Sequence, residues 1–346
     1  MRVLVTGTEG YIGARLAPWL NAHGHEVVGL DVGFYRDGTL YLDPVGLLQV
    51  PRTIHKDLRT VVPQDFEGFD AVVHLAELSN DPLGENRPEV TFKINHEGSV
   101  RIAKAAKSAG VRRFVYASSC SVYGLGSGEE FLDETSPTNP QTAYAKCKVN
   151  VERDLALMAD NDFCVSFLRN ATAYGPSPRM RFDIVLNDLC ALAWTRKRIA
   201  MISDGSPWRP IAHIEDLIEA MRCTLEAETA AVNGEIFNVG ATSENYRIRE
   251  IAEIVSKAFP GCEVTVGPPS KDNRSYRVRF DKIASKLPGF QARWTAQRGA
   301  EELRRLFERI EFTPQTYEYR AFTRLKQLKY LQRTAQINEE LFWSAM

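Results

Sequence analysis

Tyr144 and Lys148 have the types and the spacing of a proton-transfer pair. They stand in the run Tyr144-Ala-Lys-Cys-Lys148, and residues four apart share one face of a helix, so both side chains can point into one site. A free tyrosine loses its proton near pH 10, so its pKa must fall by about 3 for it to act as a base near neutrality. An ammonium about 4 Å away supplies roughly the required ~4 kcal/mol at an effective dielectric of ~20. The pair therefore predicts a tyrosine base whose pKa is lowered by Lys148.

Serine hydroxyls and a thiol follow the fourth predicted strand, in the run Ala117-Ser-Ser-Cys-Ser-Val-Tyr-Gly124. We expect Ser119 to hydrogen-bond the reacting oxygen beside Tyr144. Cys120 is a candidate acid or base, and a buried inert thiol is its alternative role. His74 ends the preceding strand and is expected to be structural. The sequence contains no cluster with metal-ligand spacing, so we predict no metal site.

A glycine-rich turn indicates what these groups act with. Gly7 follows an apolar strand, and Gly10 and Gly13 lead into a helix whose free N–H groups can hold a pyrophosphate. Asp31 ends the next strand, where a carboxylate accepts hydrogen bonds from an adenosine ribose and repels a 2′-phosphate. The pattern predicts dinucleotide binding and favours NAD over NADP. The positive nicotinamide of NAD would help Lys148 to lower the pKa of Tyr144. Arg36 could reach a 2′-phosphate and keeps NADP as an alternative, whereas a solvated loop arginine is the simpler interpretation.

Apolar strands alternate with amphipathic helices through the first half of the chain, which predicts an α/β fold with a doubly wound parallel sheet. We expect strands over 3–6, 27–30, 71–75, 113–117 and 165–168, and helices over 11–22, 94–108 and 143–158. Ligands of such sheets bind at the carboxyl ends of the strands. The fold would therefore bring the glycine-rich turn, the serines and the tyrosine to one edge.

The pattern loosens after about residue 168. We expect helices over 183–195, 214–226 and 247–258, and a strand over 235–239 that rejoins the sheet. The predicted division is an NAD-binding domain over 1–168, with return segments near 211–240, and a smaller interleaved substrate-binding lobe with a C-terminal tail over 169–346. The tail has helical spacing over 322–331, and we expect this helix to close over the second lobe.

Composition excludes several classes of function. The formal net charge of the 346 residues is −1 and no basic stripe appears, so nucleic acid is not an expected partner. No apolar run is long enough to cross a bilayer, and the chain starts directly on a core strand, so we predict neither membrane insertion nor a signal peptide. The six cysteines are scattered, which is typical of free thiols in the cytoplasm.

These motifs together resemble the extended short-chain dehydrogenase/reductases, and among them the nucleotide-sugar epimerases, dehydratases and ketoreductases. The resemblance covers about residues 1–310 and implies a Rossmann-type NAD-binding domain with a lobe for a nucleotide-diphosphate sugar. It implies that Tyr144 is the base, that Lys148 holds the nicotinamide ribose, and that Ser119 is the hydroxyl partner. The cofactor-binding residues that it implies are Gly7, Gly10, Tyr11, Ile12, Gly13, Asp31, Asp57, Leu58, Leu75, Ala76, Asn95, Tyr144 and Lys148.

The second half resembles the substrate segments of the same family. Leu168-Arg-Asn-Ala-Thr-Ala-Tyr-Gly-Pro176 is similar to a family segment, RxxNxYGP, with Thr172 where asparagine is usual. Arg209 matches an arginine that meets the substrate diphosphate, and Arg274 is a second candidate clamp, because guanidinium forks fit phosphate oxygens. Surface salt bridges are the alternative role of both arginines. Ser121 completes the predicted substrate contacts.

The residues after Ser119 bear on the reaction. Related 4,6-dehydratases place an Asp-Glu pair where Cys120 and Ser121 stand, and removal of a β-hydroxyl needs such an acid. The sequence therefore favours an NAD-dependent epimerase that acts through a transient keto intermediate. A nucleotide-4-keto-sugar reductase or dehydratase of the same family is the alternative, and a non-catalytic NAD sensor is a remote one. The resemblance also implies a homodimer.

Overall fold

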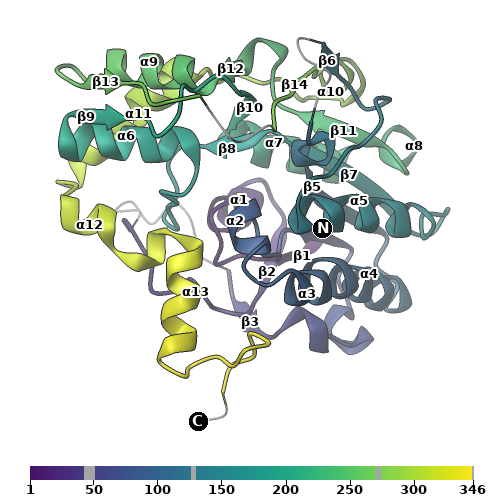
Figure 1. The fold of residues 1–346 in the computed structure, drawn as a ribbon. Coiled ribbons are helices and arrows are strands. Elements are labelled where there is room, and N and C mark those ends of the chain that lie inside the picture. The colour runs from purple at the N-terminus through teal and green to yellow at the C-terminus, as the bar shows by residue number, and fades with distance from the viewer. Residues whose placement is uncertain (43–50, 126–129, 270–273, 345–346) are drawn as a thin grey trace.

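A parallel sheet of seven strands forms the centre of the computed structural model, which describes residues 1–42, 51–125, 130–269 and 274–344 (Figure 1). The strand order is β11-β7-β5-β4-β1-β2-β3. The strands are β1 Arg2–Thr6, β2 Glu26–Asp31, β3 Thr53–His55, β4 Ala71–His74, β5 Arg113–Ser119, β7 Cys164–Asn170 and β11 Ile236–Val239. The direction of the strand order switches between β1 and β4, which are neighbours in the sheet. The carboxyl ends of these two strands therefore border a crevice, as in other doubly wound folds.

Both faces of this sheet are covered, because its strands are apolar at successive positions. Val3 and Val5 of β1 lie in one core cluster, and Leu4 between them lies in the other. Helices α1 (Gly13–Ala22) and α7 (Ile214–Glu226) pack on the first face, and α4 (Ser99–Ser108) and α5 (Ala143–Ala156) on the second. The predicted parallel α/β architecture is confirmed.

The second half of the chain builds a smaller set of layers beside the sheet. A three-stranded sheet joins β8 (Thr172–Tyr174), β10 (Trp208–His213) and β12 (Asn245–Arg247). Helices α6, α9 and α11 pack on one another at the upper left of Figure 1. The other described elements of this half are β9 Arg198–Ala200, β13 Glu263–Thr265, β14 Arg277–Val278, α6 Val185–Arg196, α8 Thr229–Val232, α9 Ile248–Ala258, α10 Asp281–Lys286, α11 Ala296–Arg309, α12 Pro314–Glu318 and α13 Arg324–Arg333.

Most predicted elements are present, and their ends differ from the prediction by at most two residues. Strand β11 lies beside β7 at the edge of the large sheet, as expected for residues 235–239. The helix expected over 94–108 begins instead with a π-helical segment, Phe92–Gly98, before α4. In the first half the sequence did not predict the short elements β3, β6 (Phe131–Leu132), α2 (Asp81–Gly84) and α3 (Pro88–Thr91). In the second half it missed the three-stranded sheet and the long helix α11. The division of the chain at residue 168 stays a prediction.

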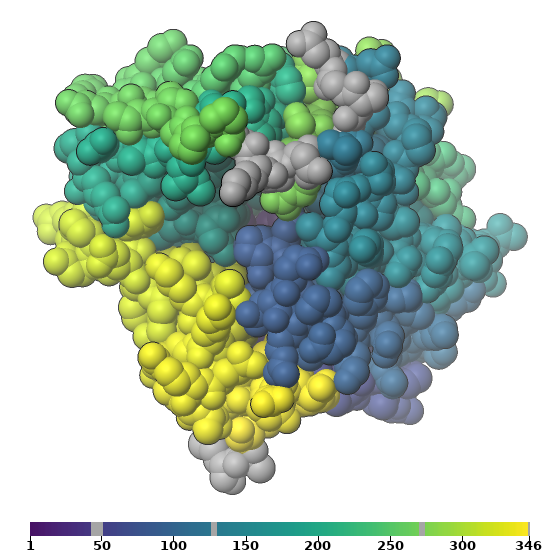
Figure 2. Space-filling model, viewed as in Figure 1, coloured from purple at the N-terminus to yellow at the C-terminus, as the bar shows by residue number. Residues whose placement is uncertain are grey.

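The C-terminal segment corrects one expectation. Leu328 and Leu331 of α13 belong to the core cluster of Leu4 and Leu30, not to the second lobe. Gln327 donates a hydrogen bond to the carbonyl of Phe34, 3.0 Å away, and the indole nitrogen of Trp343 donates to that of Val32, 2.6 Å away. The expected closure of this helix over the second lobe is therefore wrong, because its apolar face fits the NAD-binding half beside β2. Figure 2 shows this segment, in yellow, packed against the blue residues that follow β4.

Candidate active site

A cavity of about 490 Å³ lies at the carboxyl edge of the large sheet. It runs from the end of β2, past the glycine-rich turn, to the ends of β5 and β7 and to the second lobe. The predicted site residues that line it are Gly7, Gly10, Tyr11, Ile12, Gly13, Asp31, Asp57, Leu58, Leu75, Ala76, Ser119, Ser121, Tyr144, Lys148, Thr172, Arg209 and Arg274. The fold therefore brings together residues that are up to 267 positions apart in the chain, from Gly7 to Arg274.

The glycine-rich turn has the geometry that its sequence predicts. Gly7 has φ of +77°, a left-handed conformation that favours glycine, and a Cβ there would meet the backbone of Ala76 at 3.0 Å. A Cβ on Gly13 would lie 2.0 Å from the carbonyl oxygen of Gly7, so any other residue would push the start of α1 away from the strand. The turn thus leaves the helix start and its N–H groups open to the cavity, where a diphosphate would bind.

Asp31 stands at the adenosine end of the cavity. Its carboxylate accepts hydrogen bonds from the backbone N–H groups of Gly33 and Glu9, at 2.8 and 2.9 Å, which fix its orientation. Arg36 is exposed, lies against the ring of Trp343 and does not line the cavity. This exposed position agrees with the simpler interpretation of Arg36, that of a solvated loop arginine.

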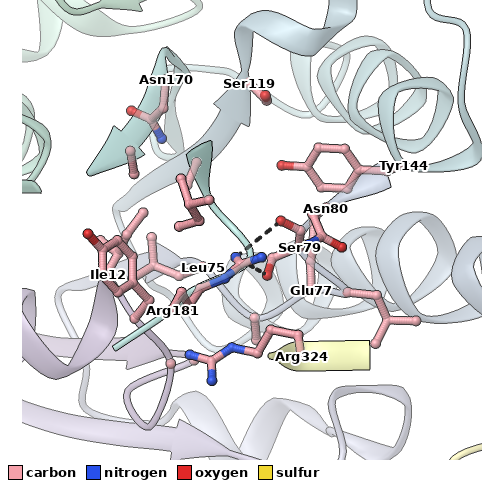
Figure 3. A pocket seen from close by; sticks show the side chains of 18 of the residues that line it. Ile12, Leu75, Glu77, Ser79, Asn80, Ser119, Tyr144, Asn170, Arg181 and Arg324 are labelled. Atoms are coloured by element: carbon pink, nitrogen blue, oxygen red, sulfur yellow. Dashed lines mark hydrogen bonds between the residues drawn. The ribbon is translucent and has the colours of Figure 1, made fainter. Parts of the chain in front are cut away.

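Tyr144 and Ser119 meet at the opposite end, as predicted. Helix α5 starts beside Tyr144 because the Thr142 hydroxyl caps it, accepting from the N–H of Ala145 at 3.2 Å. Ser119 ends β5, and its hydroxyl interacts with the phenol of Tyr144. Figure 3 shows both side chains facing the same space. This hydrogen bond lowers the pKa of Tyr144.

The side chains around Tyr144 do not by themselves produce the lowered tyrosine pKa that was predicted for Lys148 together with the positive nicotinamide of NAD. Burial raises the pKa of Tyr144 above its ordinary value, and the nearby charge of Glu77 raises it further. Lys148 Nζ lies 5.5 Å from the centre of the Tyr144 ring but 2.8 Å from Glu77 Oε2. It also donates to the carbonyl of Ala117. The ammonium of Lys148, which was expected to act on Tyr144, is therefore ion-paired mainly with the carboxylate of Glu77.

Glu77 ends the run His74–Glu77, which the sequence places beside the cofactor, but the sequence assigned no role to its carboxyl group. Its side chain is 2% exposed and lines the cavity, and its Oε1 accepts a hydrogen bond from the hydroxyl of Tyr116 at 2.6 Å. Burial raises the pKa of this carboxyl, whereas Lys148 lowers it. The available signal was its position directly after the run His74-Leu-Ala, which ends a central strand at the edge where ligands bind.

Cys120 does not take part in the site. It is 1% exposed, does not line the cavity, and its thiol donates to the carbonyl of Arg169 at 3.1 Å. Burial raises the pKa of this thiol well above its usual range, so no thiolate forms near neutrality. The short 3-10 helix Cys120–Tyr123 turns Ser121 into the cavity and Cys120 away from it. This position favours the role of an inert buried thiol over that of an acid or base.

Asn95 also differs from its predicted role as a cofactor contact. It is completely buried and its side-chain amide accepts from the N–H of Leu78 at 2.8 Å and donates to the carbonyl of the same residue at 3.0 Å. It does not line the cavity, so it holds the loop after β4 in place. His74 is structural, as expected, because its ring nitrogens bond Thr6 and Ser99 at 2.7 and 2.8 Å.

The substrate end of the cavity is bordered by two arginines. A guanidinium nitrogen of Arg209 donates to the carbonyls of Trp208 and Arg274, and Arg274 forms an ion pair with Asp81 across the opening. Two buried polar atoms, Ser121 Oγ and Asn170 Oδ1, have no hydrogen-bond partner although their residues line this end. Buried polar atoms of this kind are normally satisfied, so they indicate the position of polar ligand atoms.

A second charged group borders the cavity between its two ends. Arg181 and Asp183 follow β8, and Arg324 comes from the C-terminal segment; all three line the cavity. The sequence reasoning did not identify them, because nothing in the local pattern places residue 324 near residue 181. Figure 3 shows Arg181 and Arg324 on the side of the cavity that lies below Ile12 and Leu75 in this view.

These residues fit a dinucleotide. The glycine-rich turn leaves N–H groups for a diphosphate, Asp31 suits a ribose, and Leu58 and Leu75 give an apolar wall. Among the residues that the structure describes, no group of three His, Cys, Asp or Glu side chains could hold a metal ion. Within the same residues, no helix has the length and apolarity needed to cross a membrane.

Comparison with known proteins agrees with this site. The profile of the NAD dependent epimerase/dehydratase family matches residues 3–240. The UDP-glucose 4-epimerase of Mycolicibacterium smegmatis is 30% identical over 300 residues, covering 84% of this chain and 93% of that protein. The dTDP-D-glucose 4,6-dehydratase of Mus musculus is 28% identical over 300 residues, covering 82% of each. The solved structure of MoeE5 in complex with UDP-glucose and NAD is 27% identical, with a TM-score of 0.73 over 89% of this chain and 99% of that one.

Proposed function

Because the chain belongs to the NAD-dependent epimerase/dehydratase family of enzymes, we propose that it is an epimerase of a nucleotide-diphosphate sugar that acts through a transient keto intermediate. The curated relatives include both UDP-glucose 4-epimerases and dTDP-glucose 4,6-dehydratases, so similarity alone does not separate these reactions. The proposal rests on the acid groups of the cavity.

The described cavity has no carboxyl group that is unengaged and beside the reacting end. The carboxyl groups that line it are those of Asp31, Asp57, Glu77, Asp81 and Asp183. Asp31 accepts from two backbone N–H groups, and the other four are ion-paired with Arg59, Lys148, Arg274 and Arg181 respectively. A dehydratase needs an acid that protonates the departing hydroxyl, and each of these five carboxyl groups is already engaged by a cation or by backbone N–H groups of the protein. An epimerase needs no such acid.

The remaining groups suit one reversible oxidation. Tyr144, aligned by Ser119, takes the proton from the sugar hydroxyl and later returns it to the keto oxygen. NAD, which the glycine-rich turn and Asp31 would hold, would supply the reversible hydride acceptor for the same sugar carbon. Ser121 and Asn170 offer unpaired polar atoms to sugar hydroxyls, while Arg209 and Arg274 border the site where the substrate diphosphate would bind. The reaction is balanced, because one proton and one hydride leave and return.

The test is a panel of UDP- and dTDP-hexoses followed by NMR, with no cofactor added to the purified protein. We expect the NMR spectrum to show a new epimer. Deuterium that labels the reacting carbon of the substrate should stay on that carbon in the product. In a mixture of labelled and unlabelled sugars, no deuterium should pass from one sugar to the other. A product lighter by one water would identify a dehydratase instead. Turnover only with NADH or NADPH supplied from solution would identify a keto-sugar reductase. A protein that binds NAD but converts no sugar would support the sensor alternative.

The homodimer and the cytoplasmic location remain part of this proposal. Helices α4 and α5 pack against each other on one face of the sheet, and Val100 and Val149 on them are only partly buried. These apolar side chains could pair with a second copy. Light scattering on the purified protein would give the mass in solution, and a monomer at micromolar concentration would contradict the dimer.

A further inference from the structure

Arg324 is a buried cation that lines the cofactor cavity without a carboxylate partner. It is 1% exposed, and its guanidinium donates to the carbonyls of Ala321 and Arg179, at 3.2 and 3.1 Å. Its central carbon lies 4.2 Å from the centre of the Tyr35 ring. Among the described residues no acidic oxygen comes within ion-pair distance of this guanidinium. A guanidinium carries five N–H donors, so two carbonyls leave it under-satisfied.

Arg181 adds a second positive charge next to it. This side chain is 6% exposed and is paired with Asp183, with Nε at 2.8 Å from Oδ1 and Nη2 at 3.1 Å from Oδ2. Asp183 also accepts from the backbone N–H of Arg324 at 3.2 Å. Asp183 thus binds the guanidinium of Arg181 and the backbone of Arg324, while the Arg324 guanidinium itself contacts only carbonyl groups. Burial, and then the proximity of Arg181, lower the pKa of Arg324 to about 10.

The same residues connect three parts of the chain around the cavity. Arg181 donates to the hydroxyl of Ser79 at 3.0 Å, and the side-chain amide of Asn80 donates to Asp183 at 3.1 Å. The loop after β4, the segment after β8 and the C-terminal segment are therefore joined at Asp183. Figure 3 shows the guanidinium of Arg181 directed at Ser79, with Asn80 beside it.

We propose that Arg181 and Arg324 form a cationic wall that binds the diphosphate of NAD on the side opposite the glycine-rich turn. A buried charge without a counter-charge is costly, and an anion in the cavity would offset that cost. The cofactor diphosphate is such an anion, because the N–H groups after Gly10 and Gly13 face the same cavity. The cofactor site therefore extends beyond residues 3–240, to a residue near the C-terminus.

The first test measures how fast radiolabelled NAD leaves the holoenzyme of Arg324→Gln. We expect release about 10- to 100-fold faster than from the unchanged protein, because a charge-assisted hydrogen bond is lost. Arg324→Lys should recover part of this loss. Arg320→Gln is the matched control: Arg320 lies on the same segment, pairs with Asp37 at 3.0 Å and does not line the cavity. Its release rate should stay within about twofold.

A competition series separates the proposed role from a structural one. Adenosine, ADP-ribose, NAD and NADP would each compete with labelled NAD on both variants. Arg324→Gln should weaken ADP-ribose and NAD by the same factor and leave adenosine, which has no phosphate, unchanged. Equal weakening of adenosine would mean that the substitution only damages the fold, and would overturn the proposal. Weakening confined to NADP would assign Arg324 to a 2′-phosphate, and no weakening at all would exclude a phosphate contact.

Discussion

The carboxylate of Glu77 lies 2.8 Å from the ammonium of Lys148, and the two side chains are only 2% and 5% exposed. Lys148 is therefore held by a buried acid before any ligand is considered. The pair lies between Tyr116, which donates to Glu77, and Tyr144, whose pKa Glu77 raises. The negative charge of Glu77 thus opposes deprotonation of Tyr144, the base of the proposed reaction. The spacing of Tyr144 and Lys148 in the sequence gives no sign of this charge.

Replacing Glu77 by Gln should move the pH dependence of turnover. Removal of the negative charge lowers the pKa of Tyr144, so the limb on which activity rises with pH should shift to lower pH. The measurement is kcat against pH for the two proteins. Glu152→Gln is a matched control, because Glu152 is equally buried and paired with Arg169 outside the cavity. Both variants should lose stability, by about 3–5 kcal/mol for a broken buried pair. An unshifted limb in the Glu77 variant would contradict this coupling.

Tyr144→Phe should keep the cofactor and lose the reaction. The phenol hydroxyl is the proton acceptor, and loss of a general base lowers turnover by about 10²- to 10⁴-fold. Bound NAD, counted after denaturation, should stay unchanged. Tyr246→Phe, which removes a hydroxyl bound to Glu244 outside the cavity, should retain turnover. Normal turnover by the Tyr144 variant would exclude it as the base.

Cys120→Ser should leave the turnover rate almost unchanged. The thiol is buried, protonated and directed at the carbonyl of Arg169, and a serine hydroxyl can make the same hydrogen bond. Turnover is expected within about twofold of the unchanged protein. Ser121→Ala, one position later, removes a hydroxyl from the cavity and should raise KM by about 2- to 10-fold, the value of one hydrogen bond. A hundredfold loss in the cysteine variant would place the thiol at the substrate.

His74 should make the protein sensitive to acid. Burial lowers the pKa of its imidazole from 6.5 to about 3, so the folded protein keeps it neutral while the unfolded chain takes up a proton below pH 6.5. The unfolded state then binds more protons, so the free energy of unfolding falls as the pH drops from 6.5 towards 3, by about 2 kcal/mol at pH 5.

The check is urea unfolding of the protein and of His74→Gln between pH 7 and 4. The variant should be less stable at pH 7, by about 1–3 kcal/mol, because Thr6 and Ser99 lose a buried partner. Its stability should nevertheless depend less on pH. Parallel curves for the two proteins would mean that His74 does not titrate on unfolding.

Arg209→Gln should weaken the sugar nucleotide without affecting the cofactor. Its guanidinium borders the substrate end of the cavity, where a diphosphate contact is a charge-assisted hydrogen bond of about 1.5–3 kcal/mol. KM for the converted sugar should rise at least tenfold, with bound NAD unchanged. Arg247→Gln is the control, since Arg247 lies over the ring of Trp208 and does not line the cavity. Equal effects of both substitutions would indicate a general loss of charge.

The sequence by itself determined the parts of the protein that depend on neighbours along the chain. The apolar runs predicted the central strands, because a strand covered on both faces is apolar at successive positions. Gly7 and Gly13 indicated the turn, since only glycine permits the left-handed backbone at one and the close contact at the other. The spacing of Tyr144 and Lys148 placed both on one helix face in the cavity.

Tertiary structure alone decided what these residues meet. The partner of Lys148 is Glu77, 71 positions earlier, and the neighbour of Arg181 is Arg324, 143 positions later. Cys120 and Ser121 are adjacent in the chain, yet the turn after β5 buries one and presents the other. The side chain of Asn95 binds the backbone of Leu78 and so holds the loop after β4 in place. The C-terminal helix α13 packs beside β2. Such contacts arise from how complete elements pack, and local periodicity carries no information about partners that distant along the chain.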